Sequence, residues 1–255
     1  MTRHWVARIS IVAMTSLTIL TTTIALADEL VSEEVSFVTR DGIRIRATLA
    51  APAAAQDRKL PAVIFIHQGG SSRNEWVSLP LFDKVVASSM VALAYDVRGH
   101  GDSSGEADFN TLFDDPNQAP LDLRAAMDFV IATGRVDKDR VAVVGASIGS
   151  NLACVASGKD TYNVKTAVAM SGKTSAVLNL AGLDRSELAL GSVYHIASEF
   201  DQDGKRAEWA AELFEMTGAP RKLEIVAESA GHGVSIFTDD PSLQERVFGW
   251  LLETL

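Results

Sequence analysis

The spacing of apolar and polar residues changes once along this chain, near residue 60. Before that point, residues 34–40 and 43–49 alternate between apolar and polar side chains across Asp41-Gly42, which predicts a β-hairpin. After it, short apolar runs alternate with longer amphipathic stretches. Buried strands are predicted at residues 62–66, 91–95, 141–144, 164–170, 193–197 and 223–227, and helices at residues 74–89, 121–132, 205–216 and 243–255.

This alternation of strands and helices makes α/β the expected fold class. We expect a mostly parallel sheet of about eight strands, with helices on both faces and the antiparallel hairpin at its N-terminal side. In such sheets the functional residues lie in loops at the carboxyl ends of the strands. The loops that follow the predicted strands are therefore the place to look for candidate chemistry.

A serine lies in a tight turn shortly after the predicted strand at residues 141–144. Gly145-Ala146-Ser147-Ile148-Gly149 fits G-x-S-x-G, and a stretch typical of a helix follows. Strand, sharp turn and helix in this order form a nucleophile elbow, which lifts the serine hydroxyl clear of the sheet. The motif also occurs at residues 101–105, but no strand leads directly into it and an acidic stretch follows. We therefore interpret Ser147 as a nucleophile, the alternative being a serine that caps the next helix.

The first 27 residues have the pattern of a secretory signal peptide. Arg3 and Arg8 precede an apolar core, and Ala25-Leu26-Ala27 fits an A-x-A cleavage site. We expect cleavage before Asp28, which leaves residues 28–255 as a single domain with no stable membrane anchor. The pattern predicts a secreted or periplasmic protein, and the alternative is an uncleaved membrane anchor.

Charge and composition disfavour several classes of partner. The chain has 33 acidic and 23 basic residues, a formal net charge of −10, so nucleic acids and anionic membranes are not expected as partners. Its one cysteine, Cys154, cannot form an internal disulfide and fits a core position. Gly172-Lys173-Thr174 resembles the end of a phosphate loop, but Ala167 stands where that loop requires glycine. No motif for a metal or a nucleotide is complete, so no cofactor is expected.

Three motifs, in order along the chain, resemble those of the α/β-hydrolase superfamily. They are the elbow at Ser147, His67-Gln68-Gly69-Gly70 after one predicted strand, and Asp-Val-Arg-Gly-His-Gly at residues 96–101 after the next. Within the superfamily, the chain is most similar to small dienelactone-hydrolase-like or esterase-like members. The resemblance covers nearly all of residues 28–255 and implies an α/β-hydrolase fold, but not a particular substrate.

The resemblance also implies a catalytic triad in the order serine, acid, histidine. Its histidine corresponds to His232, in the loop after the last predicted strand. The acid follows the strand that ends at residue 197, where Ser198-Glu199-Phe200-Asp201 is similar to the family pattern and indicates Asp201. Asp203 and Glu199 are the competing carboxylates. His195 lies inside a predicted strand and is interpreted as a core histidine.

An oxyanion hole requires backbone N–H groups that face the developing negative charge. The resemblance places one at Ile148 and another in the loop after residue 66, where Gln68 replaces the commoner glycine. The second donor is Gln68 or Gly69, and Gly69 is preferred because it has no side chain to obstruct a close approach. His67 and residues 98–101 are expected to shape the loops.

These residues predict hydrolysis of a small carboxylic ester through an acyl-enzyme on Ser147. Two alternatives stay open: hydrolysis of an amide, peptide or thioester by the same triad, and an inactive binding protein of the same fold. Members of the superfamily that take long acyl chains carry a lid at the place where this chain has only residues 171–191, so little or no lid is expected. We therefore expect a shallow site for short acyl groups, with Leu178, Leu180 and Leu183 on one wall.

Overall fold

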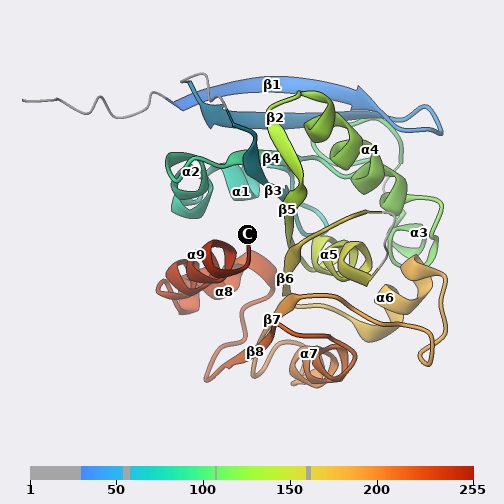
Figure 1. The fold of residues 1–255 in the computed structure, drawn as a ribbon. Helices are drawn as coiled ribbons and strands as arrows, with labels where there is room; N and C mark the ends of the chain where they lie inside the picture. The colour runs from blue at the N-terminus through green and yellow to red at the C-terminus, as the bar shows by residue number, and fades with distance from the viewer. Residues whose placement is uncertain (1–29, 54–57, 107, 159–161) are drawn as a thin grey trace, which may run out of the picture.

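A computed structural model describes residues 30–53, 58–106, 108–158 and 162–255 of the chain. The predicted signal peptide, residues 1–27, lies outside the described residues. The described strands form one sheet of eight strands in the order β1-β2-β4-β3-β5-β6-β7-β8 (Figure 1). Their bounds are Leu30–Val38 (β1), Arg44–Pro52 (β2), Leu60–Ile66 (β3), Val91–Tyr95 (β4), Val136–Ala146 (β5), Thr166–Met170 (β6), Val193–Ser198 (β7) and Arg221–Val226 (β8).

The pairing of the strands confirms the predicted fold class. β1 pairs with β2, and β2 with β4, in antiparallel orientation, while the other five pairings are parallel. The hairpin at the N-terminal side turns at Gly42, whose φ of +86° is the left-handed conformation that such a turn requires. The parallel strands therefore carry their carboxyl ends to one edge of the sheet, where the loops described below meet.

Helices cover both faces of the sheet, as predicted. α1, α2, α8 and α9 lie on one face, and α3 to α7 lie on the other (Figure 1). The bounds are Asn74–Val77 (α1), Pro80–Ala87 (α2), Phe109–Asp114 (α3), Ala119–Ala132 (α4), Ile148–Gly158 (α5), Thr174–Ala181 (α6), Lys205–Glu215 (α7), Ile236–Asp239 (α8) and Leu243–Thr254 (α9), with a 3₁₀ turn at Gly233–Ser235 (η1). In the described part of the chain, no helix is both long and apolar enough to cross a membrane.

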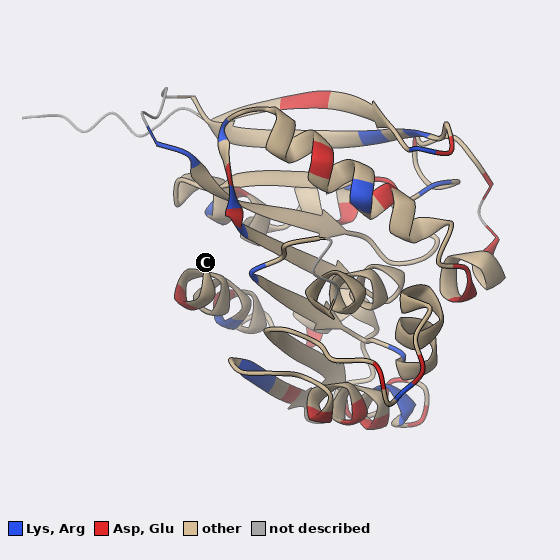
Figure 2. Ribbon diagram, turned by 45° about the vertical axis from the view of Figure 1, so that its right-hand side comes forward, with Lys and Arg blue, Asp and Glu red and all other residues tan. Residues whose placement is uncertain are grey.

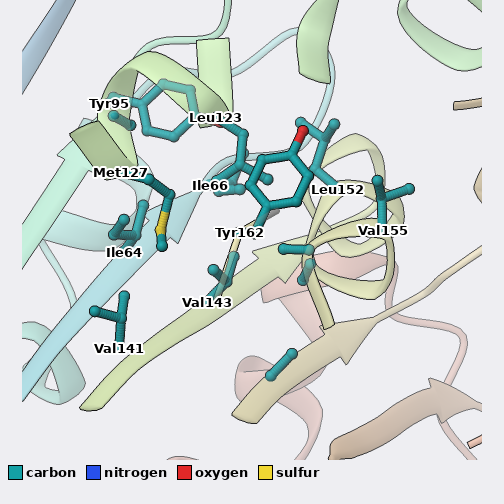
Figure 3. Close-up of a cluster of buried hydrophobic side chains, with 14 of the residues drawn as sticks. Ile64, Ile66, Tyr95, Leu123, Met127, Val141, Val143, Leu152, Val155 and Tyr162 are labelled. Atoms are coloured by element: carbon teal, nitrogen blue, oxygen red, sulfur yellow. The ribbon is translucent and has the colours of Figure 1, made fainter. Parts of the chain in front are cut away.

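Two apolar cores lie on the two faces of the sheet. On one face, Ile64, Val143 and their neighbours pack against Leu123 of α4 and Leu152 of α5 (Figure 3). On the other, residues of the same strands pack against α2 and α9. Strands β3, β4 and β6 are buried throughout and contain no charged residue, and the charged residues lie on the hairpin, the helices, the loops and strands β5 and β8 (Figure 2). The central strands are thus apolar on both sides, as expected for a sheet covered by helices.

Several elements differ from those that the apolar pattern predicts. The helix expected at residues 74–89 is two helices, because Pro80 begins α2 and fixes a new helix start there. The short helices α3, α6 and α8 were not predicted. Leu180 of α6 is fully buried in the core, and Leu178 and Leu183 pack against the same core. The prediction that Leu180 lines one wall of the site is therefore wrong.

One testable consequence concerns the contact between α5 and β3. A Cβ at Gly149 would lie 2.2 Å from the carbonyl oxygen of Ile66, so we expect Gly149→Ala to lower the free energy of unfolding by about 3 kcal/mol. Gly249→Ala is the matched control, because a Cβ at Gly249 in α9 would meet no atom within 4 Å outside its chain neighbours and the backbone of its own helix; this substitution should raise the free energy of unfolding by up to ~1 kcal/mol. Urea unfolding of both variants measures the difference. Equal stabilities would contradict this account of the contact.

Candidate active site

Ser147 lies between strand β5 and helix α5, as the elbow motif predicts. Its φ of +50° is a left-handed conformation, which costs a non-glycine residue about 1–3 kcal/mol and marks a sharp turn. The Ser147 N–H donates to the Met170 carbonyl at the end of β6 (2.8 Å), and the Ser147 carbonyl accepts from the Ser150 hydroxyl of α5 (2.7 Å). The backbone of the serine is thus held from the neighbouring strand and from its own helix.

The two glycines of the motif let the elbow pack closely. A Cβ at Gly145 would lie 2.0 Å from the Gly149 carbonyl oxygen, and one at Gly149 would lie 2.2 Å from the Ile66 carbonyl oxygen. Any side chain at either position would push α5 away from the sheet. The motif is therefore a steric requirement of this turn, which explains why its first and last positions are glycine.

The second copy of the motif, at residues 101–105, has a different role. The Ser103 hydroxyl donates to the Asp96 carbonyl (2.8 Å) and accepts from the Arg46 N–H (2.8 Å). The first bond closes the loop after β4 on itself, and the second ties that loop to strand β2. The Ser103 hydroxyl is therefore occupied by structural bonds.

His232 and Asp201 lie together at the carboxyl ends of β7 and β8. Nδ1 of His232 is 2.7 Å from Oδ2 of Asp201. The Asp201 side chain is 5% exposed, whereas that of His232 is 33% exposed, so the carboxyl group is covered and the ring reaches the surface. A buried carboxylate on Nδ1 fixes the ring orientation and the tautomer, leaving Nε2 free to accept a proton.

The loop that carries His232 is fixed against the elbow. The N–H of Gly233 donates to the Ser171 hydroxyl (3.0 Å), and the N–H of His232 donates to the Ser235 hydroxyl (2.7 Å). A Cβ at Gly233 would lie 3.2 Å from the Cβ of Ala146, the residue before Ser147. The histidine loop and the elbow are thus in contact. Within the described residues, no hydrogen bond joins the Ser147 hydroxyl to the His232 ring, and catalytic bonds of this kind often tighten only when substrate binds.

The two competing acids lie elsewhere. Asp203 is exposed, and Glu199, also exposed, accepts from the N–H of Glu228 (2.8 Å). Neither carboxylate is bonded to His232. Of the three acids considered from the sequence, Asp201 alone is paired with the histidine.

In the loop after β3, a contact that the sequence did not suggest distinguishes Gln68 from Gly69. The N–H of Gln68 donates to Oε1 of Glu75 in α1 (3.2 Å), so that this N–H is already occupied. In the part of the chain that the structure describes, the N–H groups of Gly69 and Ile148 have no acceptor. Gly69 also lies beside Ile148, because a Cβ on it would be 2.9 Å from Cδ1 of that residue. Gly69 and Ile148 are therefore the pair of candidate oxyanion donors.

His67 shapes this loop, as expected. It is buried, and burial lowers the pKa of its imidazole to about 4, so the ring is neutral at neutral pH. Nε2 accepts from the N–H of Val97 (2.9 Å), and Nδ1 donates to the carbonyl of Gln68 (2.7 Å). One neutral ring thereby joins the loop after β3 to the loop after β4.

Two buried arginines fix the same loops. Arg73 forms ion pairs with Asp96, Glu34 (2.6 Å) and Asp102 (2.9 Å). Arg98 pairs with Asp122 of α4 (2.7 Å) and with Asp41 of the hairpin turn (2.8 Å), and so shapes its loop as predicted. A buried charge that keeps its partners holds the backbone around it in one arrangement.

Helix α3, absent from the sequence prediction, contributes an aromatic ring beside the oxyanion loop. A Cβ at Gly69 would lie 2.6 Å from Cε1 of Phe109, so that ring covers the glycine, although it is 52% exposed. The signal for α3 was weak because a six-residue helix contains too few periods to recognise. Asp108, whose side chain accepts from the N–H of Asn110 (2.9 Å), is the one sequence cue for its start.

The other residues considered in the sequence analysis have structural roles. His195 is buried in β7, and its Nε2 is 2.8 Å from the Thr217 hydroxyl, which makes it the core histidine that the sequence indicated. Cys154 is buried in α5. Among the described residues, no group of three or more His, Cys, Asp or Glu side chains is arranged to hold a metal ion.

A comparison with known families identifies the class. The sequence profile of the alpha/beta hydrolase fold family matches residues 61–235, more than half of the chain. The chain therefore belongs to the α/β-hydrolase fold family, and the resemblance drawn from the sequence motifs is confirmed.

Individual relatives are distant. The uncharacterized protein YfhR of Salmonella typhimurium is 25% identical over 127 residues, which are 50% of this chain and 41% of YfhR. This chain thus spans less than half of that relative's length. An acetyl xylan esterase from Paenibacillus sp. R4 has a TM-score of 0.70 at 19% identity, over 92% of this chain and 87% of the other. A dienelactone hydrolase from Anabaena variabilis has a TM-score of 0.66 at 18% identity, over 89% and 99%. These likenesses establish a shared fold.

Proposed function

We propose that the protein is a serine esterase that hydrolyses small carboxylic esters through an acyl-enzyme on Ser147. The observation that carries the proposal is the buried Asp201 carboxylate bonded to His232, on a loop packed against the elbow that presents Ser147. An inactive binding protein would have no need to bury a carboxylate against a histidine at this place. Serine, histidine and acid come from loops after three different strands, as in other members of the fold.

The proposed reaction follows from these positions. Nε2 of His232 takes the proton of the Ser147 hydroxyl as the oxygen attacks the ester carbonyl carbon. The Asp201 carboxylate stabilises the imidazolium that forms, and the N–H groups of Ile148 and Gly69 stabilise the oxyanion. The imidazolium then donates its proton to the leaving alcohol, which leaves an acyl-enzyme. A water molecule, activated by His232 in the same way, releases the carboxylic acid and restores Ser147.

The comparisons favour an ester among the possible substrates. Two of the solved structures with this fold are named as an acetyl xylan esterase and a dienelactone hydrolase. An acetyl ester and a lactone both present a carbonyl carbon bonded to an oxygen leaving group, which the proposed chemistry cleaves. Amide and thioester hydrolysis by the same triad are outcomes that the substrate assays below would detect.

The first test concerns the nucleophile. Ser147→Ala should abolish covalent labelling by a fluorophosphonate probe and lower kcat by a factor on the order of 10⁶, because the members of a triad act as a unit. Ser103→Ala is the matched control, since it removes the serine of the second motif and should leave labelling intact. Mass spectrometry of the labelled peptide identifies the site. Equal labelling of the wild type and Ser147→Ala would exclude the proposed mechanism.

The second test separates the acids. Asp201→Asn should lower kcat by about 10⁴-fold, because the amide stabilises the wrong tautomer of His232. Asp203→Asn, at an exposed carboxylate two residues further on, should have little effect. Steady-state hydrolysis of p-nitrophenyl acetate measures both. A larger loss for Asp203→Asn would transfer the role of the acid to that residue.

The third test concerns substrate size. Only the short helix α6 and a turn lie between β6 and β7, and Phe109 next to Gly69 is half exposed, which supports an open site for short acyl groups. A methylene gains about 0.8 kcal/mol only where protein covers it, so kcat/KM should peak at short acyl chains and fall for long ones. A series of p-nitrophenyl esters from acetate to palmitate gives the profile. A maximum at long chains would show that a covered acyl tunnel exists.

A further inference from the structure

The backbone around the proposed catalytic histidine is held by side-chain oxygens at three successive residues. The N–H groups of His232 and Gly233 donate to serine hydroxyls, as described above. The N–H of Gly231, the residue before the histidine, donates to Oδ2 of Asp239 (3.1 Å), the last residue of helix α8. This carboxylate has no part in the triad, yet it contacts the loop that carries the proposed base.

The same carboxylate oxygen lies at the end of a row of two buried hydroxyl groups. Oδ2 of Asp239 accepts from the Ser229 hydroxyl (2.5 Å), and Oγ of Ser229 is 2.7 Å from Oγ of Ser198. Both serines are buried. A hydroxyl group has one proton to donate, so Ser229, which gives its proton to the carboxylate, must accept the proton of Ser198. The Ser229 oxygen also accepts from the N–H of Gly231 (3.1 Å).

This row of groups joins the loop of the acid to the loop of the histidine. Ser198 is the last residue of β7, three residues before Asp201, and Ser229 lies after β8, three residues before His232. The N–H of Phe200 donates to the Ser229 carbonyl (2.9 Å) at the same place. The two loops are therefore fixed to each other beside the point where Nδ1 of His232 is 2.7 Å from Oδ2 of Asp201.

Neither the helix nor a salt bridge accounts for Asp239. A carboxylate is disfavoured at the C-terminal end of a helix, which is where α8 holds this residue. The next residue, Asp240, pairs instead with Arg246 (2.5 Å), and its carboxylate has no bond to the histidine loop within the described residues. A Cβ at Gly231 would lie 2.7 Å from Oδ2 of Asp239, so the glycine before the histidine is what lets this carboxylate approach the loop.

We propose that Asp239 is a positioning residue of the esterase: through Ser229 and Gly231, its carboxylate holds the loop in the place where the His232 ring meets Asp201. The inference rests on the proposed function. Without the carboxylate, the buried Ser229 hydroxyl loses its acceptor, and an unpartnered buried donor is costly enough to make the loop rearrange. A displacement of about 1 Å in a catalytic group can slow a reaction by about 10²-fold.

Four variants separate this role from a general effect on folding. Asp239→Ala removes the acceptor, whereas Asp239→Asn removes the charge and keeps an oxygen that can accept the Ser229 proton. Ser229→Ala removes the next group in the row and provides the test if Asp239→Ala does not fold. Asp240→Asn is the matched control, because it weakens the ion pair with Arg246 and leaves the histidine loop untouched.

Three measurements are made on the wild type and on each variant. Hydrolysis of p-nitrophenyl acetate gives kcat and KM, and urea unfolding gives the stability. The third is the ¹H NMR signal of the proton on Nδ1 of His232, which lies far downfield while a carboxylate shares that proton. This signal reports the bond between His232 and Asp201 without any substrate.

Asp239→Ala should lower kcat by about tenfold to a hundredfold and leave KM within about twofold, because acylation and deacylation both use His232. Its downfield signal should weaken or move. Asp239→Asn should keep kcat within about threefold of the wild type. Ser229→Ala should resemble Asp239→Ala, and the two together should lose little more, because they act as one unit. Asp240→Asn should keep kcat and the signal, even if it lowers stability.

Several results would overturn the inference. They are a wild-type kcat in Asp239→Ala and Ser229→Ala, an equal loss in Asp240→Asn, losses that multiply in the double variant, or an unchanged His232 signal in Asp239→Ala. Failure of the proposed function has a different appearance, since the wild type itself would then neither hydrolyse the ester nor be labelled at Ser147.

Discussion

The close approach of helix α5 to the strands beneath it is the constraint on which the site depends. Gly145 and Gly149 allow backbone atoms to meet at distances that no Cβ tolerates, and Ser147 between them takes a left-handed conformation. These two conditions place the start of α5 over the end of β3. Ile148, the first residue of the helix, is thereby next to Gly69 of the neighbouring loop, because a Cβ on Gly69 would lie 2.9 Å from Cδ1 of Ile148. Displacing the helix by the width of a methyl group would separate these two residues.

The remaining loops are held by buried polar groups rather than by apolar packing. His67, Arg73 and Arg98 each connect a loop at the carboxyl end of one strand to another part of the chain. Bonds of this kind contribute little net stability, but removing one partner is costly, so they favour one arrangement over all others. Preorganised donors stabilise a developing charge more effectively than mobile ones, because they need no reorganisation as the charge appears.

Periodicity and motif context were sufficient to predict the fold and the turn between β5 and α5 in which Ser147 lies. The apolar runs predicted the central strands, and the G-x-S-x-G motif predicted the turn at Ser147. Both features depend on residues that are neighbours in the sequence. The sequence alone left Asp203 and Glu199 in competition with Asp201, since the bond between Asp201 and His232 joins the loop after β7 to the loop after β8. The bond between the Gln68 N–H and Glu75 could not be predicted from the sequence, because it depends on how α1 folds back on the loop after β3. The break at Pro80 and the six-residue α3 were missed because short helices carry little periodic signal.

The order of the strands also distributes the proposed triad unevenly over the sheet. Ser147 follows β5, which has a strand on each side, whereas Asp201 and His232 follow β7 and β8, and β8 is the last strand. Most of β8 is only partly covered, and it pairs with β7 alone. Edge strands of this kind open locally at a lower free energy than central ones. His232 is thus attached to an edge of the sheet, and local opening of this edge would part the histidine from Ser147 while the central strands stay paired.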